Sequence, residues 1–295
     1  MTLSAIISRS VRPFFSFEVF PPKTDAAYEN LRRILPELVA LKPDYMTVTY
    51  GAFGSTQGRT LEIAAEIQKQ FNLPTATHLT CVGSSRTDLD GILQQIEASG
   101  LRNIVALRGD PPQGQKDFVA PADGFAHAND LVAHIRARET RLQTPRCGIA
   151  VAGYPEKHIE AASLDIDLAH LKQKVDAGAD CIITQLFYDN QRFFEFEGKD
   201  RALGITVPII PGLLPILSAK QVLRILSLCG SSLPESLRAD LEAAGEDADR
   251  AEAIGVSQCI QQARELIAHG VPGIHFYVLN KSAHMIRIME GIRNP

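Results

Sequence analysis

One acidic side chain stands inside a stretch that should be a buried strand. Glu18 lies within the aromatic, β-branched run Phe-Phe-Ser-Phe-Glu-Val-Phe at residues 14–20, which two prolines terminate. Burial disfavours the charged form of a carboxyl group, so the pKa of Glu18, held among phenylalanines, is expected above the ordinary value of about 4.3. Such a group could donate a proton to a bound organic molecule near neutral pH.

A second carboxylate, Asp110, stands at the end of an apolar run. Residues 104–107 precede the charged pair Arg108 and Asp110, with Gly109 between them and two prolines after them. Because proline cannot donate to a sheet ladder, the pair should lie at the tip of a buried strand. A loop in which Asp110 only caps the next turn is the alternative, and it loses ground as the pattern recurs along the chain.

Strand-like and helix-like segments alternate throughout. Strands are expected at 14–20, 45–50, 75–81, 104–107, 147–152, 181–186, 207–210 and 273–279. Helical spacing occupies 25–41, 60–71, 87–99, 128–140, 164–177, a segment through Phe193 and Phe194, 218–228, 233–268 and a segment from about Ser282. This alternation implies parallel pairing and fits a closed α/β fold, the (β/α)8 TIM barrel, better than an open doubly wound sheet. We expect residues 1–295 to form one such barrel domain, with a helical insertion around 231–255 before the last strand.

Polar residues gather near the carboxyl ends of these strands, the face that carries the active site in such barrels. They are Glu18, Thr49, His78, Arg108, Asp110, Tyr154, Gln185 and Tyr277. A lone strand histidine such as His78 is more often a core residue. The loop at 51–58 matches no phosphate-binding motif, and the long loop at 113–124 is either a functional lid or disordered.

Composition narrows the class of protein. With 45% hydrophobic and 22% charged residues the chain is globular, and its net charge of -4 argues against nucleic-acid and anionic-membrane partners. The five cysteines are far apart, with no C-x-x-C spacing, and suggest buried thiols in a reducing compartment. No segment has the length and apolarity of a signal-peptide core or a membrane span. We expect a cytoplasmic protein.

Some chemistries fit these residues poorly. We expect no metal, because the strand ends offer no pair of nearby histidines and no H-E-x-x-H, although a scattered site from Glu18, His78 and Asp110 stays open. Schiff-base chemistry needs a lysine on a barrel strand, and the expected strands contain none. A buried carboxyl group, a loop carboxylate beside an arginine, and amide and phenol donors suit proton donation more than hydrolysis.

A set of motifs runs in order through nearly the whole chain. They are S-F-E-V-F-P-P-K at 16–23, V-T-Y-G-A at 48–52, H-L-T-C at 78–81, A-L-R-G-D-P-P at 106–112, Y-P-E-K-H at 154–158, L-K-Q-K-V-D-A-G-A at 171–179, I-T-Q-L-F-Y-D at 183–189 and H-F-Y-V-L-N-K at 275–281. Together they closely resemble the bacterial methylenetetrahydrofolate reductase family. The resemblance implies a flavoprotein that holds FAD and uses NADH or NADPH to reduce 5,10-methylenetetrahydrofolate to 5-methyltetrahydrofolate in a ping-pong reaction.

The resemblance also assigns catalytic and substrate-binding roles. Glu18 matches the general acid that protonates the departing folate nitrogen, and Asp110 matches an aspartate near flavin and pterin. Gln185 matches a folate-contacting glutamine, and Gln221, Tyr277 and Lys281 are further expected substrate contacts. Lys281 stands where an arginine is typical of relatives, so bidentate recognition of a folate carboxylate would be lost.

For FAD, the resemblance implies a larger set of residues, in which Arg108 and Lys174 are natural partners of the pyrophosphate. Asp167, His170 and Lys174 would share one helix face, which composition alone would interpret as solvated. His127 replaces a family tyrosine, and Ser218-Ala219 replaces the usual Asn-Phe. The implied cofactor-binding residues are Thr49, Tyr50, Ala52, His78, Arg108, Gly109, Asp110, Ala128, Tyr154, His158, Ala161, Asp167, His170, Gln173 and Lys174.

The expected partners are therefore small molecules, a folate and a nicotinamide nucleotide, together with further copies of the chain, because barrels of this family form dimers or tetramers. One alternative is a non-redox pterin- or folate-binding barrel that serves a methyltransferase partner. Another is a degenerate member that binds without turnover, against which the intact Glu18, Asp110 and Gln185 argue. A choice between NADH and NADPH does not follow, because there is no Rossmann strand with a ribose-reading acidic residue.

Overall fold

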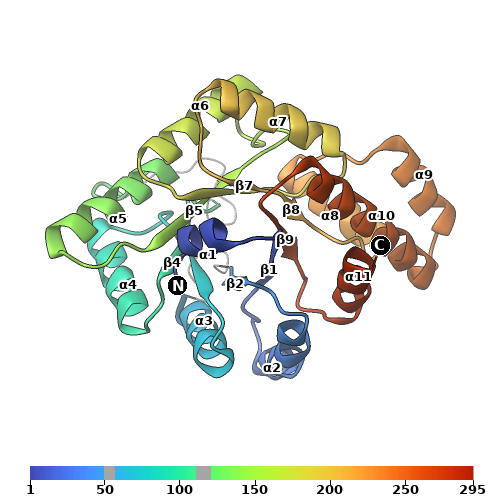
Figure 1. The fold of residues 1–295 in the computed structure, drawn as a ribbon. Helices are drawn as coiled ribbons and strands as arrows, with labels where there is room; N and C mark the ends of the chain where they lie inside the picture. The colour runs from blue at the N-terminus through green and yellow to red at the C-terminus, as the bar shows by residue number, and fades with distance from the viewer. Residues whose placement is uncertain (50–56, 111–120, 295) are drawn as a thin grey trace.

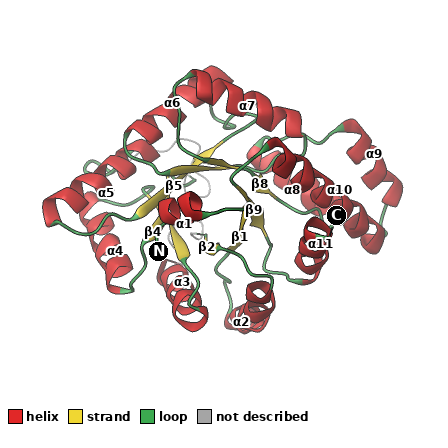
Figure 2. Cartoon of the chain, in the orientation of Figure 1, coloured by secondary structure: helices red, strands yellow, loops and turns green. Residues whose placement is uncertain are grey.

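The computed structural model describes residues 1–49, 57–110 and 121–294, so the predicted cofactor contacts Tyr50 and Ala52 lie outside the described residues. So do most of the loops expected at 51–58 and 113–124. Helices surround a central ring of strands (Figures 1 and 2). Within the described ranges, no helix combines the length and apolar character needed to cross a membrane.

The strands form a nearly closed parallel ring, in the order β7-β6-β5-β4-β3-β2-β1-β9-β8. They are β1 Phe14–Val19, β2 Tyr45–Val48, β3 Thr75–Thr80, β4 Asn103–Leu107, β5 Gly148–Gly153, β6 Cys181–Thr184, β7 Ile209–Ile210, β8 Gly212–Leu213 and β9 Gly273–Tyr277. β7 pairs with β6 and β8 pairs with β9, so one stretch split at Pro211 closes the ring. The predicted (β/α)8 barrel is confirmed, although pairing continues past Pro211, where we expected the strand to end.

Most of the described helices begin where a short polar side chain satisfies one of their first backbone N–H groups. Thr24, Ser85, Ser163 and Ser218 each accept such a hydrogen bond, and Ser85 with Asp88 forms a capping box. The helices are α1 Leu3–Arg9, α2 Asp25–Ala40, α3 Gln57–Phe71, α4 Arg86–Ala98, α5 Ala128–Leu142, α6 Leu164–Asp176, α7 Asn190–Ala202, α8 Ala219–Cys229, α9 Glu235–Ala244, α10 Ala248–His269 and α11 Ala283–Arg293.

Helix α1 was not expected from the sequence, and it lies across the centre of the barrel in Figure 1. Its residues Leu3 and Ile6 are buried in a cluster with Phe14 and Tyr45 from the strand interior. The Leu3 N–H donates to Asn103 Oδ1 at 2.7 Å. A helix of seven residues has too few turns to show a helical period in the sequence. What stabilises α1 is its packing against the floor of the barrel.

The helical pattern expected over 233–268 forms two helices, α9 and α10. Gly245 separates them with φ 57° and ψ −123°, a conformation that L side chains rarely adopt. Leu237 and Leu241 of α9 pack in a second apolar cluster with Leu214 and Leu226. The helical pattern at 233–268 was therefore correct in type, but it missed the break that separates α9 from α10.

The alternation of β1 corrects the expected surroundings of Glu18. Phe15 and Phe17 belong to the apolar layer between strands and helices, whereas Phe14 belongs to the cluster inside the ring. Successive strand residues face opposite sides, so Glu18 shares the inner face with Ser16 and Phe14. The carboxyl group is therefore not enclosed by all the neighbouring phenylalanines, and its inner-face neighbours decide its chemistry.

We predict that Gly212→Ala destabilises the ring at its closure. A Cβ there would lie 2.2 Å from the Thr184 carbonyl oxygen and 2.8 Å from the Tyr277 hydroxyl, so backbone must shift. The free energy of unfolding, measured by urea denaturation, should fall by about 3 kcal/mol. Gly198→Ala in α7 is the control, because no described atom lies within 4 Å of its added Cβ, and it should stabilise the helix by up to about 1 kcal/mol. Equal stability of the two variants would contradict the packing argument.

Candidate functional site

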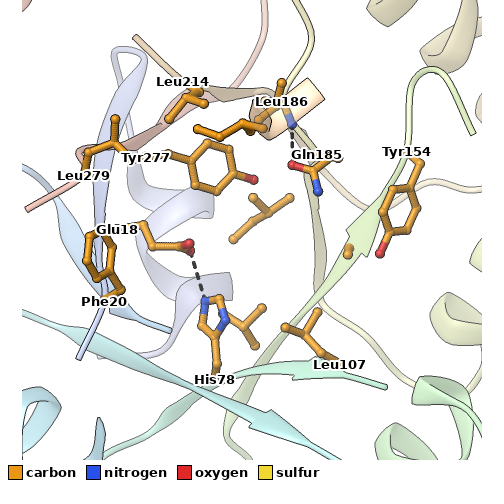
Figure 3. A pocket seen from close by; sticks show the side chains of 14 residues that line it. Glu18, Phe20, His78, Leu107, Tyr154, Gln185, Leu186, Leu214, Tyr277 and Leu279 are labelled. Atoms are coloured by element: carbon orange, nitrogen blue, oxygen red, sulfur yellow. Dashed lines mark hydrogen bonds and ion pairs between the residues drawn. The ribbon is translucent and has the colours of Figure 1, made fainter. Parts of the chain in front are cut away.

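A cavity of about 360 Å³ opens at the carboxyl ends of the strands (Figure 3). Glu18, His78, Gln185 and Tyr277 supply its polar groups, and the remainder of the wall is largely apolar. The lining residues are Glu18, Phe20, His78, Val105, Leu107, Ala152, Tyr154, Ile183, Gln185, Leu186, Leu214, Ile225, Tyr277 and Leu279. Four polar residues predicted from separate strands, and Tyr154 with them, therefore meet in one cavity.

The Glu18 carboxylate is held by groups from three other strands, β2, β3 and β9. Thr47 Oγ1 donates to Glu18 Oε2 at 2.9 Å, and His275 Nε2 lies 3.1 Å from the same oxygen. His78 Nε2 approaches it to 3.0 Å, an ion-pair contact whose angles fall outside hydrogen-bond geometry. Strand register explains the first contact, because β1 sets Glu18 beside Thr47 of β2.

These neighbours overturn the expected protonation of Glu18. Burial by itself raises the pKa of Glu18, but the two histidines, His78 and His275, outweigh it and hold that pKa well below its ordinary value. The prediction that Glu18 keeps its proton near neutral pH is therefore wrong for the protein without a ligand.

Sequence reasoning missed His275, which is fully buried. Its Nδ1 lies 2.8 Å from Ser16 Oγ, so a Ser16 hydroxyl that donates to Nδ1 leaves the proton on Nε2, facing Glu18. A signal was present, because His275 and Tyr277 are two residues apart on a strand and must share a face. The register of β1 with β9 sets Ser16 beside His275.

Gln185 and Tyr277 are both fixed by the backbone around them. Gln185 Oε1 accepts the Leu186 N–H at 2.9 Å, which turns the amide nitrogen toward the cavity (Figure 3). The Tyr277 hydroxyl donates to the Thr184 carbonyl at 2.7 Å. Both side chains are thus held in place at the wall of the cavity.

A second cavity, of about 350 Å³, adjoins the first and shares Leu107, Ala152 and Tyr154 with it. Most of the described residues predicted to bind a cofactor line this cavity. Its lining is Ala106, Leu107, Arg108, His127, Ala128, Asn129, Ala152, Tyr154, His158, Glu160, Ala161, Asp167, His170, Gln173 and Lys174. His78 was also predicted to contact the cofactor, but it lines the first cavity and not the second.

Two cations face this second cavity. Arg108 is paired with Glu160, whose hydrogen bonds raise the pKa of the guanidinium. Lys174 Nζ donates to the Ala152 carbonyl at 2.6 Å, and burial lowers the pKa of Lys174 to about 8 despite the nearby Asp167 and Asp200. The pKa value leaves Lys174 mostly protonated at neutral pH.

The helix face predicted on α6 is not simply solvated. Asp167 is buried, and its Oδ2 accepts the His158 N–H at 2.9 Å. His170 is exposed, and its ring lies 6.4 Å from that of His127, nearly parallel to it. His127 begins α5 without a side-chain capping bond, while Ala128 and Asn129 of the first turn line the cavity. An uncapped helix N-terminus thus opens on the same space as the two cations.

The other predicted site residues lie outside the described walls of both cavities. Thr49, Asp110, Gln221 and Lys281 are not among the described lining residues, so their roles stay predictions. Gly109 is required structurally, because its φ is +89° and a Cβ would lie 2.5 Å from Val82 Cγ1. Across the described part of the chain, no three His, Cys, Asp or Glu side chains converge to hold a metal ion.

A buried acid that sequence reasoning missed, Asp200 of α7, interacts electrostatically with Asp167 and Lys174 of the second cavity. Its side chain is fully buried, and neither carboxylate oxygen accepts a hydrogen bond from a described residue. Burial raises the pKa of Asp200 from 3.8 to about 7, against the opposing effect of Arg201. The protonated form is therefore the one that the fold favours.

We predict that Asp200→Asn stabilises the protein at alkaline pH. Because its folded-state pKa is raised, the stability linked to the Asp200 proton is complete below about pH 4 and is lost as pH rises through about 7. At pH 8 the free energy of unfolding of the variant should exceed that of the wild type by roughly 2 kcal/mol. This is about half of the free energy linked to the raised pKa, because the asparagine amide is also a buried polar group. The difference should shrink toward pH 5 in urea titrations. A difference independent of pH would show that Asp200 does not titrate in this range.

The fold and the site together define a (β/α)8-barrel protein with two adjoining ligand cavities at the carboxyl ends of its strands. Residues 3–293 match the family model described as methylenetetrahydrofolate reductase, and the chain belongs to this family. The predicted family resemblance is thereby confirmed.

Two curated relatives and one solved structure place the chain within that family and fold. Methylenetetrahydrofolate reductase (NADH) 1 of Arabidopsis thaliana is 43% identical over 287 residues, covering 94% of this chain and 48% of the relative. The 5,10-methylenetetrahydrofolate reductase of Pectobacterium carotovorum is 37% identical, covering 90% of this chain and 86% of the relative. The chain thus spans about half the length of the plant relative and most of the bacterial one. An uncharacterized protein from Clostridium thermocellum, described as binding two copies of 5-methyl-5,6,7,8-tetrahydrofolic acid, has the same fold, with TM-score 0.64, 16% identity and coverage of 99% and 98%.

Proposed function

We propose that the protein reduces 5,10-methylenetetrahydrofolate to 5-methyltetrahydrofolate with electrons from NADH or NADPH, passed through bound FAD in a ping-pong reaction. The observation that carries the proposal is the Glu18 cluster in a cavity that shares a wall with a cation-lined cavity. The names of the relatives support the same reaction, and some of those names specify NADH.

The second cavity fits the diphosphate of a dinucleotide. Arg108, Lys174 and the uncapped first turn of α5 all present positive charge or N–H groups to it. Helix N-termini and guanidinium groups are the donors that phosphate oxygens prefer in proteins. Bound FAD would supply hydride transfer between the nicotinamide and the folate. Tyr154, which lines both cavities, would mark the boundary between cofactor and substrate.

The first cavity offers one place for two substrates in turn, as a ping-pong reaction requires. Its apolar wall of Phe20, Leu214 and Leu279 suits flat aromatic groups, and the Gln185 amide suits a polar pterin edge. A volume of about 360 Å³ is small for a nicotinamide and a pterin together with their attached groups. That limit supports the proposed alternation of the two substrates at a single site.

Glu18 delivers the proton that the departing folate nitrogen needs. Because the pKa of Glu18 is held low in the free protein, Glu18 must first take up a proton. The doubly protonated form of His275 or His78, whose Nε2 atoms lie beside the same carboxylate oxygen, supplies that proton and returns to its neutral form. A ligand that covers the cavity removes water from Glu18, which favours its neutral form. The cluster therefore stores the proton, and Glu18 places it at the reacting atom.

Steady-state turnover tests the proposal. With oxygen excluded, purified protein should oxidise NADH beyond one equivalent per flavin only when methylenetetrahydrofolate is present, and mass spectrometry should find 5-methyltetrahydrofolate as the product. Binding of 5-methyltetrahydrofolate without any NADH or NADPH oxidation, in protein incubated with FAD, would instead favour the non-redox folate-binding barrel.

A further inference from the structure

Arg108, a cation at the wall of the second cavity, is held in an ion pair with Glu160. Arg108 Nη1 and Nη2 donate to the two Glu160 carboxylate oxygens at 2.6 and 2.8 Å. The Arg108 side chain is 21% exposed, whereas that of Glu160 is 51% exposed. The cation is thus largely covered, while its carboxylate partner remains in contact with solvent.

Glu160 presents to Arg108 the kind of oxygen pair that a phosphate would present. Guanidinium groups bind carboxylates and phosphates through the same pair of parallel N–H donors. Both residues line the cavity, so a ligand phosphate that reaches Arg108 meets a guanidinium already paired in this way. Binding then exchanges one ion pair for another, and only the difference between them adds to affinity.

The loop that carries Glu160 is anchored by contacts other than this pair. Glu156 accepts the Ser232 N–H at 3.0 and 3.1 Å, and the Glu160 N–H donates to His158 Nδ1 at 3.1 Å. His158 is held in turn by Asp167, which accepts the His158 N–H. Rotation of the half-exposed Glu160 side chain therefore breaks its ion pair with Arg108 while the loop stays in place.

We propose that Glu160 is an internal competitor for the anionic group of the bound dinucleotide and limits how tightly the protein holds it. The inference rests on the proposed FAD-dependent function, but it applies to any diphosphate that reaches Arg108. Neutralisation of Glu160 takes away one anion that competes for Arg108, so affinity should increase.

The test compares FAD binding to the apoprotein of the wild type, Glu160→Gln and Glu156→Gln, followed by quenching of flavin fluorescence at several NaCl concentrations. Glu160→Gln should bind FAD roughly fivefold more tightly, the effect of one partly exposed ion pair. The FAD affinity of Glu160→Gln should also fall more steeply as the NaCl concentration rises, because ligand binding no longer replaces an existing ion pair between Arg108 and Glu160. Glu156→Gln removes the same charge from the same loop, yet Glu156 contacts Ser232, so it should match the wild type. Riboflavin, which has no phosphate, should bind all three proteins equally.

FAD affinity of Glu160→Gln equal to or weaker than that of Glu156→Gln would overturn the inference, because Glu160 would then position Arg108 and not compete for it. If the wild type binds no FAD, the proposed cofactor is wrong, and calorimetric titration with inorganic pyrophosphate decides the inference on its own. Tighter pyrophosphate binding by Glu160→Gln would support it, and equal binding by both variants would overturn it.

Discussion

Glu18→Gln is expected to separate the two halves of the reaction. Reduction of the flavoprotein by NADH needs no proton from Glu18 and should stay within about twofold of the wild-type rate. Reoxidation by methylenetetrahydrofolate should slow by about a thousandfold, the middle of the range for loss of a general acid. Anaerobic stopped-flow absorbance at the flavin band measures each half separately.

The control is Glu195→Gln, which makes the same chemical change at an exposed position of α7. Both of its half-reactions should match the wild type. Glu18→Gln should also keep the fold, because a glutamine oxygen can still accept from Thr47 and His275. Reoxidation of Glu18→Gln by methylenetetrahydrofolate at the wild-type rate would remove Glu18 from the role of proton donor.

Arg108→Met is expected to yield protein that loses its cofactor during purification. The change removes a bidentate cation from the second cavity and leaves Glu160 there without that partner. Hydrogen bonds to charged groups contribute about 1.5–3 kcal/mol, so FAD should bind roughly 10- to 100-fold more weakly. Equilibrium dialysis of FAD against the apoprotein measures the effect.

Arg141→Met provides the matched control for that loss of charge. Arg141 is exposed near the end of α5, and its partner is Asp90, so FAD affinity should be unchanged. Circular dichroism should show native folding for both variants. Full FAD retention by a folded Arg108→Met protein would show that the diphosphate does not bind at Arg108.

The barrel was predictable because its evidence is repeated along the chain. Apolar strands, helical spacing and polar strand ends each recur, and parallel strands must bring their carboxyl ends to one face. That geometry was enough to place Glu18, His78, Gln185 and Tyr277 together. The break at Gly245 and helix α1 were not predictable in the same way, because a single backbone torsion and a short helix that fills the barrel floor leave little periodic pattern.

The electrostatics of the site depended on contacts between distant segments. The low pKa of Glu18 arises from His78 and His275 together, and His275, 257 residues away in the chain, reaches Glu18 only through the register of β1 with β9. The Arg108–Glu160 pair likewise joins residues 52 apart. Asp200 gave no signal, because a helical segment rich in acidic and basic residues does not reveal which one is buried. The sequence was enough to predict that polar residues meet at one end of the barrel. The direction of a pKa change could not be predicted, because it depends on which atoms are in contact.

The central claim is that this barrel holds a flavin that NADH reduces and a folate reoxidises, and the visible spectrum of the purified protein tests it most directly. Under anaerobic conditions, NADH should bleach a flavin band and methylenetetrahydrofolate should restore it. Absence of any flavin band, even after incubation with FAD, would contradict the claim and favour a folate-binding barrel without redox chemistry.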